Sequence, residues 1–558
     1  MTKQRYRFLS IIMIAALLIS SLAIGASASD GPPDAPPGGG GPGGAPGGSS
    51  ADIDYSGAVE ITSTDTQVDQ TYETSTVDQS ALLISTSDDV TITNPTVSKT
   101  GDSDGGDNCN FYGLNAAVLV KDGSNTTIEG GTITSDASGA NGVFSYGGNG
   151  GQNGAEGDGT TVTIRDTTIT TTGSGSGGIM TTGGGITYAY DLTVETSGQS
   201  SAAIRTDRGG GTVYVDGGTY TSNGLGSPTI YSTADVNVAN ATLVSNLSEG
   251  VCIEGINSIT LENCDMTANN TQCNGNATFL DTIMIYQSMS GDADSGTSTF
   301  SMTDGSLTSL NGHMFHVTNT NAVINLSGVD LINEDSDNVL LSVCADGWNG
   351  DNNIATLNAD AQTLEGTVLV GDDSQLTMNL SDGSRFTGNI DGNITNAKGD
   401  TVSTEVGPVS VTLDDSSVWV LTADSYVSEF NGDPANVYSN GYTLYVAGET
   451  LSGTSEGMPA EEAEEPADAL IAEQTEETAS EVVSEEVPVE ETEEAPAEEA
   501  VSAQDEVNET AADSQPDAGA ETQQTSHTGA IVAVVLVILC AAVIAALVIR
   551  NRKKSSNS

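Results

Sequence analysis

The residues best suited to chemistry are two arginines that flank an aspartate, Arg205, Asp207 and Arg208, directly before the glycines at 209–211. Guanidinium groups bind carboxylates and sulfates through paired hydrogen bonds, so Arg205 and Arg208 are expected to bind an anionic group of a ligand. If the protein is an enzyme, Arg205 would serve as the base, with Asp207 and Arg208 beside it. The alternative is structural, because the same charges could form salt bridges that hold a glycine turn in an otherwise acidic surface.

Two short acidic stretches have the composition of calcium-binding loops. Asp102, Asp104 and Asp107 lie close together, and so do Asp292 and Asp294. Calcium prefers carboxylate oxygens, and the glycines in both stretches allow the tight turns that such loops need. Neither stretch has the remaining ligands of an EF-hand, so solvated acidic loops are the alternative.

Aromatic side chains in the expected loops are suited to stacking on sugar rings. We assign Tyr146, Tyr231 and Trp348 to ligand binding for this reason, together with Arg205 and Arg208. The alternative for such residues is packing in a hydrophobic core.

Two of the three histidines, His313 and His316, lie three residues apart in an expected strand. Residues three apart on a strand point to opposite faces. The two imidazoles are therefore not expected to bind one metal ion unless the strand is bulged.

The chain of 558 residues has a formal net charge of −63, because 77 acidic residues accompany only 14 lysines and arginines. Nucleic acids and anionic membranes require basic faces, so this balance argues against both as docking partners and favours cations. Of the six cysteines, Cys540 lies in the C-terminal apolar run. The other five are an odd number, which leaves at least one thiol unpaired and a Cys252–Cys273 or Cys264–Cys273 disulfide open.

The elements that must position these residues come from one short repeated phrase. The phrase is an apolar residue, any residue, Gly, Asp or Asn, any residue, Thr, Ser or Asp, and an apolar residue. It recurs at 128–133, 164–169, 215–220, 238–243, 261–266, 302–307 and 326–331. We interpret it as a strand, a tight turn and a second strand, because Gly, Asp and Asn tolerate the backbone of a tight turn.

The spacing of the phrase predicts a solenoid. Val194 is followed after 26 residues by Tyr220, Tyr220 after 23 by Leu243, and Leu243 after 23 by Met266. Apolar residues alternate with polar ones within each segment. Each coil can bury its inward row only by stacking on a neighbouring coil. We therefore predict an all-β fold, a right-handed parallel β-helix over residues 51–455. A leucine-rich repeat has a similar period, but its Leu-x-x-Leu-x-Leu frame is not found.

Segments outside the solenoid have distinct compositions. Residues 1–28 combine basic residues, an apolar stretch and a small-residue cleavage site, as in a secretory signal peptide. Residues 29–50 are rich in Gly and Pro and form a flexible linker. Insertions at 147–159, 269–281 and 288–298 are expected as loops on one face. Residues 425–446 are expected to form a closing β-hairpin that turns at Asn440-Gly441.

The C-terminal residues predict a stalk and an anchor. Residues 456–521 contain 24 acidic residues and no Lys or Arg, so we expect a disordered stalk over 456–528. Residues 529–549 are long and apolar enough for one transmembrane helix, and a basic tail at 550–558 follows. This order predicts a single-pass cell-membrane protein with an extracellular N-terminal domain. Processing by a sortase is the alternative, although only Thr528-Gly529 of a Leu-Pro-x-Thr-Gly signal is present.

The repeat pattern over roughly residues 52–450 resembles the pectate-lyase-like superfamily of right-handed parallel β-helices. It is more similar still to adhesin-like microbial surface proteins that carry such solenoids. The resemblance implies a fold and little about activity. Lyases of that superfamily use an Arg or Lys base beside calcium-binding carboxylates, whereas its glycosidases use clustered Asp residues and a Gly-His-Gly motif. Residues 312–314, which read GHM, depart from that motif.

We therefore expect an adhesin-like surface protein that binds extracellular glycans or neighbouring surfaces through one face of the solenoid. The alternative is a cell-surface polysaccharide lyase or glycosidase, which would need a groove of ionisable residues on adjacent coils around Arg205. A structural envelope component would instead have a featureless surface.

Overall fold

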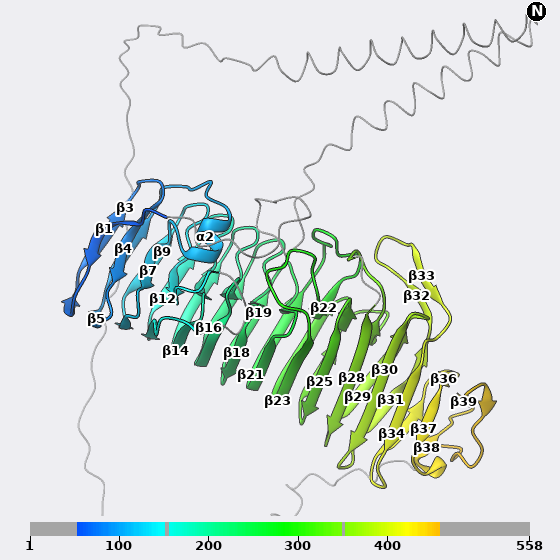
Figure 1. Cartoon of the computed structure of the whole chain (residues 1–558). Coiled ribbons are helices and arrows are strands. Elements are labelled where there is room, and N and C mark those ends of the chain that lie inside the picture. Colours follow the sequence, from blue (N-terminus) through cyan, green and yellow to red (C-terminus); the bar gives the residue numbers. More distant parts are fainter. Residues whose placement is uncertain (1–52, 151–155, 349–351, 458–558) are drawn as a thin grey trace, which may run out of the picture. The chain divides into compact units, whose positions relative to one another are not determined.

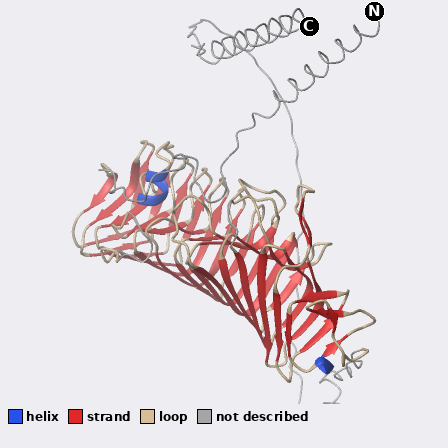
Figure 2. Ribbon diagram, turned by 45° about the vertical axis from the view of Figure 1, so that its right-hand side comes forward, coloured by secondary structure: helices blue, strands red, loops and turns tan. Residues whose placement is uncertain are grey.

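The structure, a computed structural model, describes residues 53–150, 156–348 and 352–457. The chain divides into two compact units, residues 1–462 and 463–558, and every described residue belongs to the first. This unit is a stack of short strands, and each coil pairs in parallel with the next (Figures 1 and 2). Long parallel sheets with this connectivity are consistent with the predicted β-helix solenoid.

One long sheet, here called sheet A, receives one strand from each coil and has 15 strands, all parallel. Its strands are β1 (Ser56–Ile61), β4 (Gln79–Ser85), β7 (Val118–Lys121), β10 (Val143–Tyr146), β13 (Ile179–Thr182), β15 (Ile204–Thr206), β17 (Ile230–Ser232), β20 (Val251–Glu254), β22 (Asp281–Tyr286), β24 (His313–Thr318), β27 (Val339–Val343), β29 (Thr363–Val370), β31 (Arg385–Asp391), β35 (Val418–Leu421) and β38 (Val437–Tyr438).

The second long sheet, sheet B, has 20 strands and contains the repeated phrase. In its first half it consists of β2 (Asp65–Val68), β3 (Thr71–Thr74), β5 (Asp89–Thr93), β6 (Thr96–Lys99), β8 (Asn125–Glu129), β9 (Thr132–Ser135), β11 (Thr161–Arg165), β12 (Thr168–Thr171), β14 (Gly185–Thr196) and β16 (Gly211–Ser222). It continues with β18 (Asp235–Ala239), β19 (Thr242–Ser245), β21 (Ser258–Asn269), β23 (Thr297–Asn311), β25 (Asn321–Ser327), β26 (Asp330–Asn333), β28 (Asn353–Asp360), β30 (Ser374–Ser381), β34 (Val409–Leu413) and β37 (Glu429–Asn431).

The predicted strand–turn–strand phrase is confirmed at 128–133, 164–169, 238–243 and 326–331, whereas at 215–220, 261–266 and 302–307 one long strand continues through a residue of positive φ. In residues 128–133 it ends β8, turns at Gly130 and Gly131 with φ of 68° and 75°, and begins β9. In other coils Asn240 and Asn263 occupy the turn with φ of 55° and 51°. The Asn263 amide donates to the Asn240 side chain at 2.8 Å, so the turns are also linked between coils.

The predicted period is confirmed residue by residue. Val194 pairs with Tyr220, Tyr220 with Leu243, and Leu243 with Met266. Met266 then pairs with Leu307, so the insertions between these two residues leave the coil register intact. These side chains lie in one hydrophobic core that runs through the stack. A narrow core of this kind is filled mainly by Val, Ile, Leu and Ala.

The C-terminal hairpin prediction is wrong. β36 (Ser425–Val427) and β39 (Leu444–Val446) pair in parallel, so they continue the coil winding across residues 440–441. The antiparallel pair is instead β39 with β40 (Glu449–Thr450). A second antiparallel hairpin, β32 (Asn393–Thr395) with β33 (Thr401–Thr404), leaves the stack (Figure 1). The Asn-Gly pair did not distinguish a hairpin from a bend between two parallel layers.

Two short helices complete the described residues: α2 (Asp107–Tyr112) and a 3₁₀ helix, η1 (Pro434–Asn436). Neither disulfide left open by the sequence, Cys252–Cys273 or Cys264–Cys273, forms among the described cysteines. The predicted signal peptide, linker, transmembrane helix and basic tail lie outside the described residues, as does the stalk beyond residue 457. Within the described ranges, no helix is long and apolar enough to cross a membrane.

Candidate functional site

The outer face of sheet A is buried beneath loops in its middle part, from β10 to β27. In β22 all six residues are buried, although only alternate side chains can enter the core. The outward positions of neighbouring coils are in register, so Arg205 lies beside Tyr231, Cys252 follows, and Met284 and His316 continue the row. The candidate residues Arg205, Tyr231 and His316 therefore lie in a buried layer between sheet A and its loops, not at the surface.

Arg205 is held in an internal ion pair. Its Nη2 lies 2.9 Å from Oδ2 of Asp207, and the two side chains are 4% and 2% exposed. Its Nη1 donates to Oδ1 of Asn110 in α2 at 3.2 Å and to the carbonyl of Ser200 at 3.1 Å. Burial raises the pKa of Asp207, although the charge of Arg205 opposes this shift. The Arg205 guanidinium thus connects a strand of sheet A to the helix above it.

Arg208 forms an ion pair with a second loop, which contains Asp292. Its Nε donates to Oδ1 of Asp292 at 3.1 Å, and its guanidinium lies 4.1 Å from the ring centroid of Phe111. Asp292 belongs to the predicted 288–298 insertion, so Arg208 connects this loop to the residues that follow β15 of sheet A. Arg205, Asp207 and Arg208 match the salt-bridged turn that the sequence left as the alternative.

The three predicted sugar-stacking aromatics are buried in the same layer. Tyr231 donates its hydroxyl proton to Oε2 of Glu254 at 2.7 Å, and Tyr286 donates to the same oxygen at 3.3 Å. Trp348 packs against Tyr286 with ring centroids 4.9 Å apart, and Tyr146 is only 5% exposed. The structure thus places these rings between sheet A and its loops.

The five aspartates proposed for calcium do not form one cluster. Asp102 and Asp104 are exposed, and Oδ1 of Asp102 accepts the backbone N–H of Ser138 at 2.8 Å. Asp107 begins α2, Asp292 binds Arg208, and Asp294 is exposed. Among the described residues, no group of three or more His, Cys, Asp or Glu side chains is arranged to hold a metal ion.

The two histidines lie on the same side of sheet A, contrary to the expectation of opposite faces. Nδ1 of His313 and Nδ1 of His316 lie 2.7 and 2.8 Å from Oγ of Ser342. His313 is the first residue of β24 and follows Gly312, whose φ is 83°, so strict alternation does not yet apply to it. Burial lowers the pKa of His313 to about 3, which leaves this imidazole neutral at physiological pH.

A further buried acidic group lies beside these histidines. Asp281 pairs in register with His313, and the Gly250 N–H donates to the Thr282 carbonyl, which brings Glu249 to the adjacent coil. Burial raises the pKa of both Glu249 and Asp281, and the nearby Glu249 and Asp346 carboxylates raise the pKa of Asp281 further. Both side chains are at most 2% exposed. They are closed off from solvent and offer no open site for a substrate.

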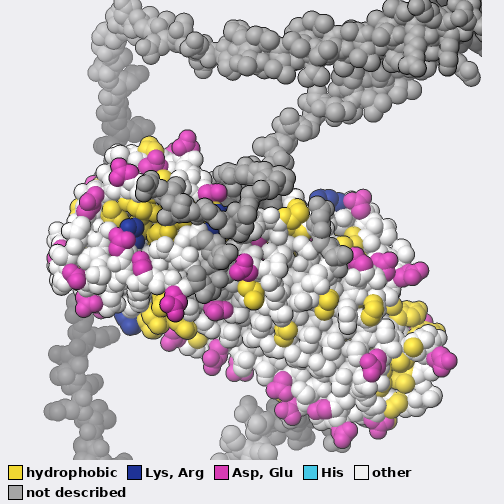
Figure 3. Space-filling model, in the orientation of Figure 1, with side chains coloured by type: hydrophobic (Ala, Val, Ile, Leu, Met, Phe, Trp, Pro, Cys, Tyr) yellow, Lys and Arg dark blue, Asp and Glu magenta, His cyan; other side chains and the backbone are white. Residues whose placement is uncertain are grey.

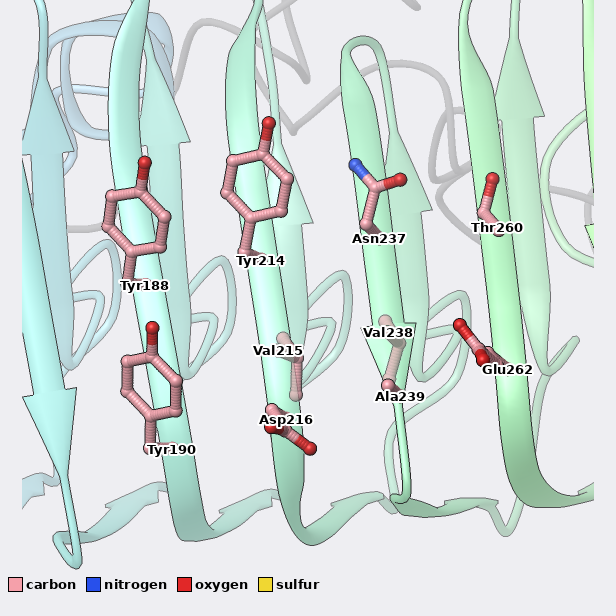
Figure 4. Close-up of a pocket in the computed structure, with 10 residues that line it drawn as sticks. All are labelled: Tyr188, Tyr190, Tyr214, Val215, Asp216, Asn237, Val238, Ala239, Thr260 and Glu262. Atoms are coloured by element: carbon pink, nitrogen blue, oxygen red, sulfur yellow. The ribbon is translucent and has the colours of Figure 1, made fainter.

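An open site lies instead on the outer face of sheet B. Ten residues from β14, β16, β18 and β21 line a shallow groove with a volume of about 340 Å³ (Figure 4). The residues are Tyr188, Tyr190, Tyr214, Val215, Asp216, Asn237, Val238, Ala239, Thr260 and Glu262. The groove crosses four successive coils, so its length follows the solenoid axis and not the strands.

Tyrosine rings occupy one end of this groove. Tyr188 and Tyr214 face each other across adjacent coils in register, with centroids 5.1 Å apart and planes 10° apart. Tyr190 lies two residues further along β14, and the guanidinium of Arg165 lies 3.9 Å from its ring centroid. Tyr214 is 43% exposed, an unusual value for a large ring in this chain. We call Tyr188, Tyr190 and Tyr214 the tyrosine platform.

Polar side chains continue from the tyrosine platform in two rows. The register places Asn237 beside Tyr214 and Thr260 beside Asn237 in the first row. In the second row Asp216 follows Tyr190, and Glu262 lies two coils beyond Asp216. Figure 4 shows both rows projecting from the same face of the strands. Hydrogen-bonding groups thus lie directly beside apolar rings.

The tyrosine platform was not predicted from the sequence. A signal was present in the alternation of β14 and β16, where Tyr188 and Tyr214 occupy an outward position that Thr or Asn fills in most other coils. No family model, curated protein or solved structure that was compared with the chain matches it. The functional interpretation therefore depends on the site alone.

Proposed function

We propose that this protein is a surface-displayed, adhesin-like binding protein that holds glycans on the tyrosine platform of sheet B. The observation that carries the proposal is the in-register Tyr188–Tyr214 pair in an open groove. Apolar faces of sugar rings stack on aromatic side chains, and adjacent amide, hydroxyl and carboxylate groups can bind sugar hydroxyls. Among the residues that the structure describes, no loop or strand closes this groove.

The position of the site suits display on a cell surface. In this proposal residues 1–28 direct secretion, residues 529–549 anchor the chain, and the acidic stalk extends the solenoid away from the membrane. We further propose a right-handed winding, because parallel strand crossovers are almost always right-handed, and a pectate-lyase-like relationship of fold. A rigid rod on a stalk is a suitable support for a binding face.

The enzymatic alternative has less support from the geometry. A lyase base must reach its substrate, whereas the Arg205 guanidinium is buried and engaged by Asp207, Asn110 and Ser200. The groove on sheet B contains carboxylates but no Lys, Arg or His among its lining residues. The site therefore favours binding over lyase chemistry, and a test for released reducing ends in the glycan panel separates binding from a glycosidase that would use two carboxylates.

A glycan panel probed with the full chain tests the proposal. Tyr188→Ala and Tyr214→Ala should each weaken binding by about 1–2 kcal/mol, or roughly 5- to 30-fold, as for central aromatic contacts in other interfaces. Tyr426→Ala is the matched control, because Tyr426 stacks on Tyr445 with centroids 5.1 Å apart and is similarly exposed. This control should bind like the parent protein. Equal binding by all variants, or an absence of any glycan ligand, would contradict the proposal.

A further inference from the structure

We infer that the groove on sheet B selects a linear polysaccharide that carries free amino groups and lies along the solenoid axis. This inference rests on the proposed function and names its ligand class. It follows from the length of the groove, the order of its side chains and the position of its charges.

The length of the groove favours a chain of sugars over a single sugar. Its lining residues come from four successive coils, β14, β16, β18 and β21. Neighbouring strands are about 4.8 Å apart, so the groove spans roughly 14 Å along the axis. A single sugar would contact only part of this length. An extended chain of sugars laid across the strands would contact the tyrosine platform at one end and the polar rows at the other.

The charged residues that line the groove beyond the tyrosine platform are both acidic. Asp216 and Glu262 lie in the same outward row, and Ala239 occupies the coil between them. Two coil steps separate the carboxylates by roughly 9–10 Å. Ala239 has a short side chain that leaves the space between them open. Both acidic residues are exposed, and Asp216 accepts a hydrogen bond from the side-chain amide of Asn240 at 2.7 Å.

This arrangement complements a cationic ligand. Arg165 is the nearby base, but its guanidinium packs on Tyr190 at the opposite end of the groove from Glu262. An anionic polysaccharide would meet two carboxylates, and it would approach a protein with a net charge of −63. A protonated amine gains attraction at both carboxylates, while Asn237 and Thr260 remain available to sugar hydroxyls. Figure 3 shows how sparse Lys and Arg are among the acidic side chains on one face of the molecule.

The test compares hexasaccharides of glucosamine, N-acetylglucosamine, glucose and galacturonic acid for binding to the full chain at pH 6, where the glucosamine amine is protonated. The glucosamine hexamer should bind tightest at low salt. The double variant Asp216→Asn/Glu262→Gln should lose roughly 2- to 5-fold affinity per carboxylate for this hexamer, as expected for exposed ion pairs. Its affinity for the N-acetylglucosamine hexamer should fall less, because that ligand has no protonated amine to pair with the two carboxylates. Added salt should reduce only the amine-dependent part of the affinity.

Asp360→Asn provides the matched control. Asp360 continues the same outward row beyond Glu262, at an exposed position outside the groove. Its substitution should leave every affinity unchanged. If Asp360→Asn weakened glucosamine binding as much as the double variant, non-specific attraction to an acidic surface would explain the result and overturn the inference.

The two proposals fail in different ways. If all hexamers bind with equal affinity and depend on Tyr188 and Tyr214, the tyrosine platform binds glycans but the amine selection is wrong. If glucosamine binds independently of both tyrosines, the inferred path of the polymer is wrong. If no hexamer binds, the inference and the proposed function both lose their support.

Discussion

Removing one member of the Arg205–Asp207 pair should destabilise the fold far more than it alters ligand binding. The two side chains are 4% and 2% exposed, so solvent screens their interaction little. Arg205→Met leaves the Asp207 carboxylate buried without its partner and removes the donor to Asn110. Loss of one partner of a buried ion pair costs about 3–5 kcal/mol. We therefore expect a loss of that size in the free energy of unfolding.

A double-mutant cycle measures this pair directly. Arg205→Met, Asp207→Leu and the combined variant would be unfolded in urea while circular dichroism reports the loss of strands. The combined variant should lose less stability than either single variant, because no buried charge is left unpaired. Lys121→Met is the control, since the 2.7 Å Lys121–Asp122 pair is partly exposed and should contribute at most about 1 kcal/mol.

Hydrogen exchange adds a local readout. Exchange at α2 should accelerate in Arg205→Met, because Arg205 holds Asn110 of that helix. The reasoning would be refuted if Arg205→Met unfolded like the parent protein while abolishing glycan binding. That result would restore Arg205 as a ligand contact.

Two further predictions concern stability. Burial raises the pKa of Asp281 in the folded state, so the folded protein holds this proton more tightly than the unfolded chain does. The free energy of unfolding should therefore fall as pH rises above about 4. The loss should be at most about 1.4 kcal/mol per pH unit. Asp281→Asn should remove this penalty, so thermal unfolding should show the variant to be the more stable protein at pH 8; a less stable variant there would contradict it. Gly131→Ala should cost more than Gly383→Ala in urea unfolding. Both glycines have positive φ, but only at Gly131 would the new Cβ lie 2.2 Å from the Pro95 carbonyl. Equal losses in the free energy of unfolding would argue against the close approach of Gly131 to Pro95.

The coil register could be predicted from the sequence because each coil repeats the same physical requirement. Tyr220, Leu243 and Met266 had to enter one core, and the turns between them needed residues such as Asn240 that tolerate positive φ. These constraints act within a coil and on its immediate neighbours, so spacing alone reveals them. The hairpin at residues 440–441 was predicted wrongly because Asn-Gly is also suited to bends between parallel layers.

The functional layer was harder to predict because it depends on contacts between distant residues. Arg205 meets Asn110, which is 95 residues away, and Arg208 meets Asp292, 84 residues away. Nothing in the local sequence shows that loops cover one sheet and leave the other open. The tyrosine platform was missed because sugar-stacking rings were sought in expected loops, whereas Tyr188 and Tyr214 occupy outward positions in strands.

The central claim is that glycans bind on the outer face of sheet B, and hydroxyl-radical footprinting of the full chain tests it most directly. Oxidation of each tyrosine would be measured by mass spectrometry with and without a saturating glycan. Tyr188, Tyr190 and Tyr214 should become protected, while Tyr426 and Tyr445 should react as before. Protection confined to the loops over sheet A, or unchanged oxidation of the tyrosine platform at saturation, would contradict the claim.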